Sequence, residues 1–460
     1  MQERTLRKAM DAGADYCDIR VERKHGLSLE LKDGELREAI PGDESGMCIR
    51  VLFNGAWGHC SVNDLSAKAT ERAMDTAVTL ARARAGRIKP SEKVRLSPLK
   101  HEKKSVIRKL GRNPHDIPLE EKHRLLLEIN GALTAIPEVR SVTALYGDGT
   151  KCMHFISSEG ADIYTEVTRV VASGRVVVKN ENGALGGRAA VGGTSGYGIF
   201  SDEDPVEKAV AAARSAIVTL SGKKAPSGRF PVVADPVLTG VFAHEAIGHA
   251  VEGDIVVSGD SCLQGMFGKM VGSPLVTLVD DPTIPGAFGS FPYDDEGVQA
   301  RRKVLIDKGR MTGYITDRES AFRLKTESNG AARAESYCVR PIVRMSNTFI
   351  EKGDAASKEL FEGIRLGIYA LGSRGGQVDT AKGSFQFSCK EAFLIENGEV
   401  TSPLRNLALS GIILETLKNV EAVGRDITVR EPGYCGKGQT VAVGDGGPHI
   451  RISSVAVGGG

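Results

Sequence analysis

The stretch VFAHEAIGHAVEGD, residues 241–254, places two histidines and a glutamate inside an apolar run. In the zinc-binding His-Glu-x-x-His pattern the histidines are four residues apart, whereas His244 and His249 are five apart. On an ideal helix, at about 100° per residue, a gap of four leaves two side chains about 40° apart and a gap of five leaves them about 140° apart. Either these residues do not hold a metal, or the helix that carries them is not regular.

A wider turn would bring the two imidazoles together. In a π-type turn, with roughly 4.4 residues per turn, a gap of five places both side chains on one face. Gly248 directly precedes His249 and lets the helix widen at low steric cost. The spacing therefore predicts a π-type turn between His244 and His249. Glu245 then has the position of the base that a metal-dependent hydrolase needs.

The third metal ligand is left open by the residue pattern. A catalytic zinc takes three protein ligands and keeps one position free. Several acidic or thiol side chains are candidates, some near the helix and some distant in sequence: Glu252, Asp254, Asp260, Cys262, Cys338, Cys389 and Cys435. The competing interpretation is that His244 and His249 are two ordinary histidines on a half-buried helix.

The chain on either side of this helix predicts an α+β protein with two domains. The segment SGKKAPSGRFP, residues 221–231, is rich in Gly, Pro and Lys, so we place a boundary there and predict domains over 1–225 and 226–460. The first is expected to be an α/β domain with a mixed sheet and the second a β-rich domain that carries the histidine helix. Helices are expected near 2–12, 64–85, 118–134, 204–220, 356–366 and 404–418, and a further helix is expected to begin at Asp235-Pro236. A hairpin is expected to turn at Asn54-Gly55. A helix followed by strands occurs near 1–61 and again near 118–178, which suggests a duplicated unit.

Composition gives no sign of a nucleic-acid or membrane partner. The chain has 60 basic and 58 acidic residues, and it contains no apolar run long enough to span a bilayer. The basic stretch 82–112 has no aromatic residue for base stacking, so we interpret it as a solvated loop. The eight cysteines are scattered without a Cys-x-x-Cys pair, and no apolar secretory segment is present, which predicts free thiols and a cytoplasmic location.

The acidic triplet Asp294, Asp295 and Glu296 has two interpretations. It is either a solvated turn or a set of carboxylates that orient a ligand histidine. The glycine-rich stretches 183–200 and 372–379 lack the Gly-Lys-Ser/Thr of a phosphate-binding loop, so we interpret them as strands of small residues.

The stretch HEAIGHAVEGD resembles the signature of the TldD/PmbA family, in particular its TldD branch. Further blocks resemble the family in the expected order over the C-terminal half, at residues 293–321, 344–353, 375–379, 391–400 and 435–450. The N-terminal half is similar more loosely, as in RVLFNGAWG and IPLEEKHRLLLEI. The resemblance therefore covers nearly the whole chain.

This resemblance implies a metallopeptidase with one Zn²⁺ per chain. It implies that His244, His249 and Cys435, the cysteine of the block CGK, hold the zinc and that Glu245 is the base. Five further residues are candidates for contacts with the ligands or the substrate: Glu252, Asp254, Asp294, Asp295 and Gly376. The resemblance also implies a homodimer, or a heterodimer with a PmbA-type subunit, that admits unfolded polypeptide into an internal cavity. The alternatives are a non-catalytic peptide-binding subunit and a regulator of a nucleic-acid enzyme.

Overall fold

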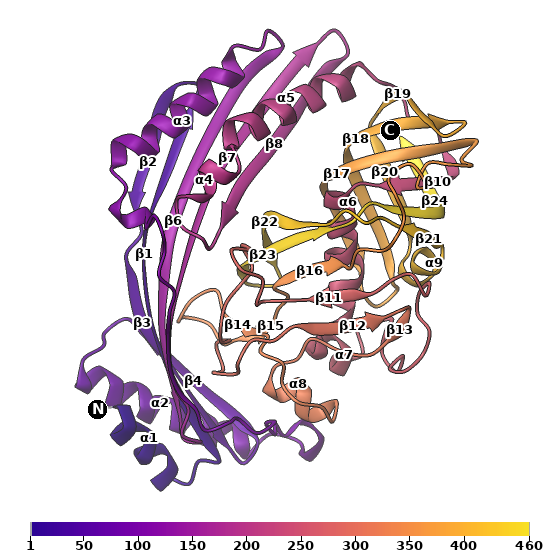
Figure 1. The fold of residues 1–460 in the computed structure, drawn as a ribbon. Helices are drawn as coiled ribbons and strands as arrows, with labels where there is room; N and C mark the ends of the chain where they lie inside the picture. The colour runs from indigo at the N-terminus through magenta and orange to yellow at the C-terminus, as the bar shows by residue number, and fades with distance from the viewer. Residues whose placement is uncertain (1, 460) are drawn as a thin grey trace.

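Two long antiparallel strands organise the N-terminal half (Figure 1). β6 (Val139–Ser157) and β7 (Asp162–Asn180) have 19 residues each, which corresponds to roughly 60 Å of extended chain. They belong to an eight-stranded sheet in the order β4-β3-β1-β6-β7-β5, with β2 paired to β1 and β8 paired to β7. Because β5 runs parallel to β7 while the other pairs are antiparallel, the sheet is mixed, as predicted.

The structure is a computed structural model that describes residues 2–459. The remaining strands of the first sheet are β1 (Tyr16–Lys32), β2 (Glu35–Pro41), β3 (Glu44–Phe53), β4 (Ala56–Val62), β5 (Lys103–Ile107) and β8 (Gly183–Gly193). The helices of this half are α1 (Gln2–Asp11), α2 (Ala67–Ala85), α3 (Leu119–Thr134), α4 (Ile199–Asp202) and α5 (Pro205–Ser221), with 3-10 turns η1 (Pro90–Glu92) and η2 (Pro114–Asp116).

Helices cover the two ends of this sheet separately, as Figure 1 shows. One apolar cluster joins α1 and α2 to β1 and β3, and another joins α3 and α5 to β1, β6 and β7. The local signals that predicted these elements are confirmed. Asp204 accepts the Val206 N–H at the start of α5, and the β3–β4 hairpin turns at Asn54 and Gly55, whose φ values are +46° and +82°.

The C-terminal half consists of two further sheets with the histidine helix between them. An eight-stranded sheet has the order β17-β10-β24-β20-β18-β19-β9 with β21 paired to β24, and a six-stranded sheet has the order β13-β12-β11-β16-β23-β22. The helix contacts β17 of the first sheet and β16 and β23 of the second. A single large apolar cluster fills the space around it. The protein is therefore α+β, with a β-rich C-terminal half.

The elements of this half are as follows: β9 (Lys223–Lys224), β10 (Gly228–Ala234), α6 (Pro236–Val241), η3 (Phe242–Gly248), η4 (His249–Val251), α7 (Gly253–Ser258), β11 (Leu278–Asp280), β12 (Lys303–Asp307), β13 (Arg310–Met311), α8 (Arg318–Arg323), β14 (Ala332–Arg333), β15 (Ile342–Val343), β16 (Asn347–Ile350), β17 (Leu366–Asp379), β18 (Ser384–Glu396), β19 (Glu399–Arg405), β20 (Leu407–Ile412), α9 (Ile413–Lys418), β21 (Val420–Val423), β22 (Thr428–Gly436), β23 (Thr440–Gly447) and β24 (Ile450–Gly459). β14 and β15 form a two-stranded sheet of their own.

Three predicted elements differ from the structure. The range 356–366 forms turns rather than a helix. Residues 407–412 form β20, in which Leu407 and Leu409 are buried on alternate positions, a period of two that belongs to a strand. The basic stretch 82–112 is not one loop, because Lys103–Ile107 form β5 and pair with β7.

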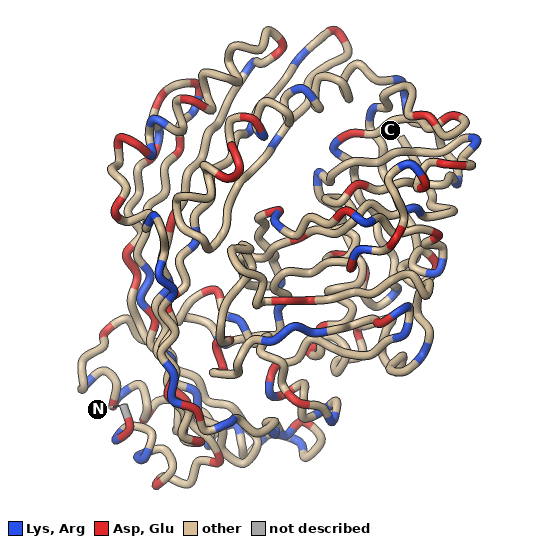
Figure 2. The backbone as a smooth tube through the Cα atoms, viewed as in Figure 1, with Lys and Arg blue, Asp and Glu red and all other residues tan. Residues whose placement is uncertain are grey.

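Charged residues of both signs are spread over the whole chain (Figure 2). Along the middle of the long strands, where the N-terminal sheet faces the C-terminal half, basic and acidic residues are interspersed rather than segregated. Within residues 2–459, no helix is both long and apolar enough to cross a lipid bilayer.

Candidate metal centre

The histidine helix begins where the sequence places its start. Asp235 is the N-cap, its carboxylate accepts the Leu238 N–H at 2.8 Å, and Pro236 occupies the first helical position. The same carboxylate accepts the Gly372 N–H at 2.8 Å, which ties the start of the helix to β17. A Cβ at Gly240 would lie 2.2 Å from the Gly446 nitrogen, so glycine here allows α6 to approach β23 closely. This approach brings the side chains of β23 within reach of the helix.

The helix widens into a π-helix over η3, Phe242–Gly248, as the histidine spacing predicts. The His249 N–H donates to the carbonyl of His244, five residues back, which is the hydrogen bond that defines this geometry. A Cβ at Gly248 would lie 2.1 Å from the sulfur of Met345, so a larger residue does not fit at the wide turn. The two imidazole centroids are 5.3 Å apart with their planes at 86°. The predicted π-type turn is confirmed.

Three side chains converge beyond this turn. One donor atom from each of His244, His249 and Cys435 lies within 4.8 Å of the others. The Cys435 sulfur is 3.4 Å from Nε2 of His249, although the two residues are 186 positions apart in the sequence. His244 and Cys435 are buried, and the His249 side chain is 12% exposed. The structure therefore brings together the three residues that the family resemblance named.

Each histidine has a carboxylate next to its Nδ1 atom. Nδ1 of His249 is 2.8 Å from Oε2 of Glu252, which is fully buried. Nδ1 of His244 is 2.9 Å from Oδ1 of Asp445 on β23. A carboxylate on one ring nitrogen fixes the orientation of the ring and leaves the other nitrogen free for a metal. Asp445 was not predicted; its only sequence signal is an acidic residue within the strand TVAVGDGG.

The Cys435 strand is fixed by two cations. Arg344 is buried and donates to the carbonyls of Cys435 and Gln439. The ammonium group of Lys437 lies 2.9 Å from both carboxylate oxygens of Asp254 and 3.2 Å from Oε2 of Glu252. This chain of contacts connects the cysteine strand to the carboxylate that orients His249. Neither Arg344 nor Lys437 was among the site residues predicted from the sequence.

The electrostatics of the cluster favour a thiolate beside protonated imidazoles. Burial raises the pKa of Cys435, but the two histidines outweigh it and lower that pKa to about 6. Burial lowers the pKa of His249, but Cys435 and Glu252 raise it to about 9. For His244 the effect of burial is outweighed by Asp445 and Cys435, which raise its pKa well above the ordinary value. A thiolate is the form of cysteine that binds zinc.

The donor set fits a zinc ion. Two imidazoles and one thiolate are typical zinc ligands and leave a fourth position for water or substrate. Across a tetrahedral zinc with bonds of about 2.05 Å to nitrogen and about 2.3 Å to sulfur, the N···S separation is about 3.6 Å. The observed 3.4 Å between His249 and Cys435 is close to this value.

Glu245 lies beside the cluster, and His249 is the cation near its carboxylate among the described residues. The Glu245 side chain is 39% exposed, and its Oε2 is 3.7 Å from Nε2 of His249. The neighbouring residues Ala243, Ala246 and Ile247 are fully buried in the apolar cluster. The helix thus presents Glu245 to the space next to the three donor atoms while its other side packs in the core.

The other predicted site residues lie elsewhere. Asp294, Asp295 and Glu296 are buried, so the solvated-turn interpretation is wrong. Their carboxylates do not orient a histidine: Asp294 accepts three main-chain N–H groups, including that of Ala332, and Asp295 pairs with Lys151 at 2.8 Å.

The remaining two candidates are Gly376 and Asp254. Gly376 is an exposed residue of β17, and a Cβ there would lie 2.2 Å from the Phe387 ring, so its lack of a side chain serves strand packing. Asp254 contacts Lys437 and its own helix rather than either histidine.

Comparison with known proteins places the chain among the metallopeptidases. The PmbA/TldA metallopeptidase C-terminal domain matches residues 227–459, the central domain of the same family matches 112–220, and domain 1 matches 17–81. The chain belongs to the PmbA/TldD family.

Individual relatives extend this result over the whole chain. A metalloprotease of Methanothermobacter thermautotrophicus is 43% identical over 446 residues, covering 97% of this chain and 96% of the relative. The zinc metalloprotease TldD homolog of Saccharolobus solfataricus is 31% identical and covers 99% of each chain. The structure of TldE from Thermococcus kodakarensis has the same fold, with a TM-score of 0.79, 22% identity and 99% of each chain covered.

Proposed function

We propose that the protein is a zinc-dependent peptide hydrolase that cleaves unfolded or extended polypeptides internally. The observation that carries this proposal is the convergence of His244, His249 and Cys435 beside the carboxylate of Glu245. In this proposal the first three residues hold one zinc ion per chain and the fourth is the general base. The zinc metalloprotease name of the Saccharolobus relative supports the choice of metal.

The chemistry divides between the metal and Glu245. A zinc ion with three protein ligands supplies a Lewis acid and lowers the pKa of water at its open position to near neutrality. Glu245 takes a proton from the attacking water and delivers it to the leaving amine. Its 39% exposure leaves it accessible to both groups. Glu252 and Asp445 hold the imidazoles in the orientation that this arrangement requires.

An edge strand beside the cluster supports an extended substrate. Among residues 2–459, β22 pairs with β23 and with no other strand, although part of β8 lies close to it, and Cys435 lies near its end. The free side of an edge strand offers main-chain donors and acceptors to a peptide, which binds by adding a strand. Recognition through the main chain requires an extended substrate and selects weakly among sequences. We therefore expect the unfolded form of a protein to be the substrate.

Assembly and location complete the proposal. We propose a dimer, formed with a second copy or with a PmbA-type subunit, as the family resemblance implies; the match of the PmbA/TldA domains to the chain supports that family. All eight cysteines are free, which supports a reducing compartment such as the cytoplasm. The mass of the purified protein, alone and with a PmbA-type chain, tests the assembly.

The Glu245→Gln variant tests the activity. It should keep its zinc and lose at least about a hundredfold in the rate of peptide cleavage, because an amide cannot accept the proton from the attacking water. The measurement uses a reduced, carboxymethylated protein and its native folded form, and the wild-type enzyme should cleave the former much faster. Glu415→Gln, which removes an exposed carboxylate remote from the cluster, is the control and should keep full activity. Undiminished cleavage by a zinc-loaded Glu245→Gln enzyme would refute the assignment of the base.

A further inference from the structure

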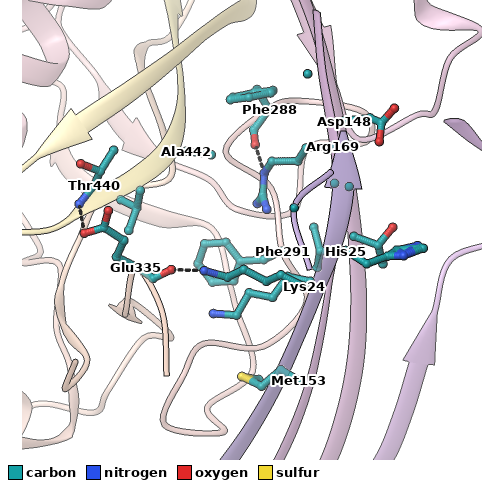
Figure 3. Close-up of a pocket in the computed structure, with 18 of the residues that line it drawn as sticks. Lys24, His25, Asp148, Met153, Arg169, Phe288, Phe291, Glu335, Thr440 and Ala442 are labelled. Carbon is teal, nitrogen blue, oxygen red and sulfur yellow. Dashed lines mark hydrogen bonds between the residues drawn. The ribbon is translucent and has the colours of Figure 1, made fainter. Parts of the chain in front are cut away.

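A second candidate site lies on the other side of the cysteine strand from the metal centre. A cavity of about 550 Å³ opens where β1, β6 and β7 face the loop 288–295 and the β22–β23 hairpin. Figure 3 shows Arg169 entering it from the long strands, with Phe291 and Lys24 beside it and Phe288 above. The walls combine aromatic rings with cations, a lining that neither the metal centre nor its base uses.

Within residues 2–459, two arginines that line this cavity have no carboxylate in direct contact with them. Arg169 donates to the carbonyls of Phe288 at 2.7 Å and Ser290 at 3.0 Å. Arg333 is 7% exposed and donates to the carbonyls of Met345 and Ala442 at 2.6 and 2.7 Å. Among the residues that the structure describes, neither guanidinium forms an ion pair. Carbonyl oxygens satisfy the donors but do not neutralise the charge.

This arrangement lowers the pKa of both guanidinium groups. Burial lowers the pKa of Arg169 to about 10. Burial, and then the charge of Arg169, lower the pKa of Arg333 to about 9. The two cations therefore repel each other in a poorly solvated space, which is unfavourable unless an anion enters. A charged group that lines a cavity without a direct ion-pair partner is typical of a binding site.

The acidic residues of the same cavity are committed to other partners. Asp294 accepts three main-chain N–H groups, and Asp295 pairs with Lys151 at 2.8 Å and accepts the Ala334 N–H at 2.7 Å. Glu335 accepts the Thr440 N–H at 3.0 Å (Figure 3). Asp148, the fourth acidic residue of the walls, pairs with Lys122 at 2.6 Å. The charge of Asp295 acts on both arginines through space and raises their pKa values, but no carboxylate of the described walls forms an ion pair with either guanidinium.

The cavity lies next to β22, the strand along which we propose that the peptide binds. Tyr434, whose ring packs edge-on to Phe288 at 5.4 Å, lines the cavity, and the next residue is Cys435. Side chains of successive residues in a strand point to opposite faces of the sheet. A peptide added to β22 would therefore direct alternate side chains toward the face that Tyr434 occupies.

We propose that this cavity binds a carboxylate of the substrate peptide, with Arg169 and Arg333 as the cationic partners and Phe288, Phe291 and Tyr434 as the apolar walls. The inference rests on the proposed peptidase function and specifies its substrate class. The carboxylate comes either from an acidic side chain or from the carboxyl terminus of the peptide. The first source gives cleavage near Asp or Glu, and the second gives cleavage near the end of a chain.

Peptide binding to the zinc-loaded Glu245→Gln protein separates these sources. The probes are fluorescein-labelled octapeptides of alanine and serine that carry Glu or Gln at one scanned position, each as a C-terminal acid and a C-terminal amide. A charge-assisted contact contributes about tenfold or more in affinity. We expect at least about tenfold tighter binding for Glu over Gln at one position, or for the acid over the amide. Equal affinities throughout the set would overturn the proposal.

Two arginines of β7 provide the matched pair of variants. Arg169→Met should abolish the preference for the carboxylate, whereas Arg175→Met, an exposed arginine on the same face of the strand, should leave it unchanged. Arg169→Lys keeps the charge and should retain part of the preference, so it replaces the methionine variant if that protein does not fold. A preference that survives in Arg169→Met, or that is undiminished in Arg169→Lys, would refute the site. Clear discrimination in binding together with no cleavage by the zinc-loaded wild-type enzyme would instead refute the proposed activity and leave the site intact.

Discussion

Two buried clusters of ionisable side chains differ in how completely their members are paired. At the junction of the two halves, Arg50 contacts Asp18 at 2.6 Å and Glu296 at 3.0 Å, and Arg20 contacts Glu22 at 2.9 Å. Each of these carboxylates lies against an arginine, and Asp18 and Glu296 share Arg50. At the metal centre the carboxylates face away from the metal position, and two imidazole nitrogens and a sulfur converge on one another.

The comparison separates a structural cluster from a functional one. The junction cluster consists of ion pairs between opposite charges, which hold β1 and β3 against the loop 294–296. The metal cluster leaves three strong donors pointed at one position, an arrangement that a bound cation would stabilise. Burial and charge are common to both regions. The two regions differ in whether their charged groups lie against groups of opposite charge, as at the junction, or converge on one position, as at the metal centre.

The largest expected effect comes from removing the cation that Asp18 and Glu296 share at the junction. Arg50→Met leaves Asp18 and Glu296 buried without their cation and should reduce the free energy of unfolding by about 3–5 kcal/mol. Urea unfolding measures this loss, and zinc content should remain unchanged. Arg37→Met, which breaks the exposed pair between Arg37 and Glu35, should cost less than about 1 kcal/mol. Comparable losses in the two variants would contradict the distinction drawn here.

The next effect is the pH dependence of zinc binding. In the metal-free protein the raised pKa values leave both histidines protonated near pH 7, while Cys435, with a pKa of about 6, is already a thiolate. Zinc needs neutral imidazoles, so binding should release about two protons, and the affinity should rise by up to about a hundredfold per pH unit. Calorimetry in buffers of different ionisation enthalpy measures the release. A third proton near pH 7 would show that the Cys435 thiol is not ionised, and no release would show neutral histidines.

The same shifts have opposite effects on the stability of the metal-free fold. The raised pKa of His249 stabilises the fold below its ordinary value of 6.5 and loses this contribution as the pH rises through about 9. The lowered pKa of Cys435 stabilises the fold above its ordinary value of 9.0 and loses this contribution as the pH falls through about 6. Between these limits the two contributions change in opposite directions. The pH dependence of zinc binding is therefore the more informative readout.

A smaller effect is expected from the carboxylates behind the histidines. Glu252→Gln and Asp445→Asn should each weaken zinc binding by about 10–100-fold without unfolding the protein, because the imidazoles lose their orienting partners. Competition with a chromophoric chelator measures the affinity. Asp254→Asn is the matched control, since Asp254 reaches the cluster through Lys437 and not through a histidine. An equal loss in all three variants would indicate a general effect of negative charge rather than orientation.

The sequence predicted those features of the site that are local. The spacing of His244 and His249 requires a wide turn, and Asp235 with Pro236 marks the start of the helix, so both were found without a structure. Cys435 was assigned through family resemblance, because no local pattern relates it to a helix 186 residues earlier. Asp445 was missed for the same reason.

Features that depend on distant partners could not be predicted. The sequence left Asp294, Asp295 and Glu296 between a solvated turn and a set that orients a histidine, because the cations that face Asp295 and Glu296 come from the distant strands β1, β3 and β6. Residues 407–412 were predicted to be helical because their pairing with the distant strands β18 and β24 cannot be inferred from the local sequence. Charge in a sequence is thus a weaker guide than spacing, since its meaning is set by what the fold brings opposite to it.

The metal content of purified protein tests the central claim most directly. Wild-type protein should contain one zinc per chain, and Cys435→Ala should lose nearly all of it, because two imidazoles alone do not complete a three-ligand site. Cys262→Ala removes a half-buried free thiol that lies outside the cluster and should retain full zinc. Stoichiometric zinc in the Cys435→Ala protein would contradict the assignment of His244, His249 and Cys435 as the ligands.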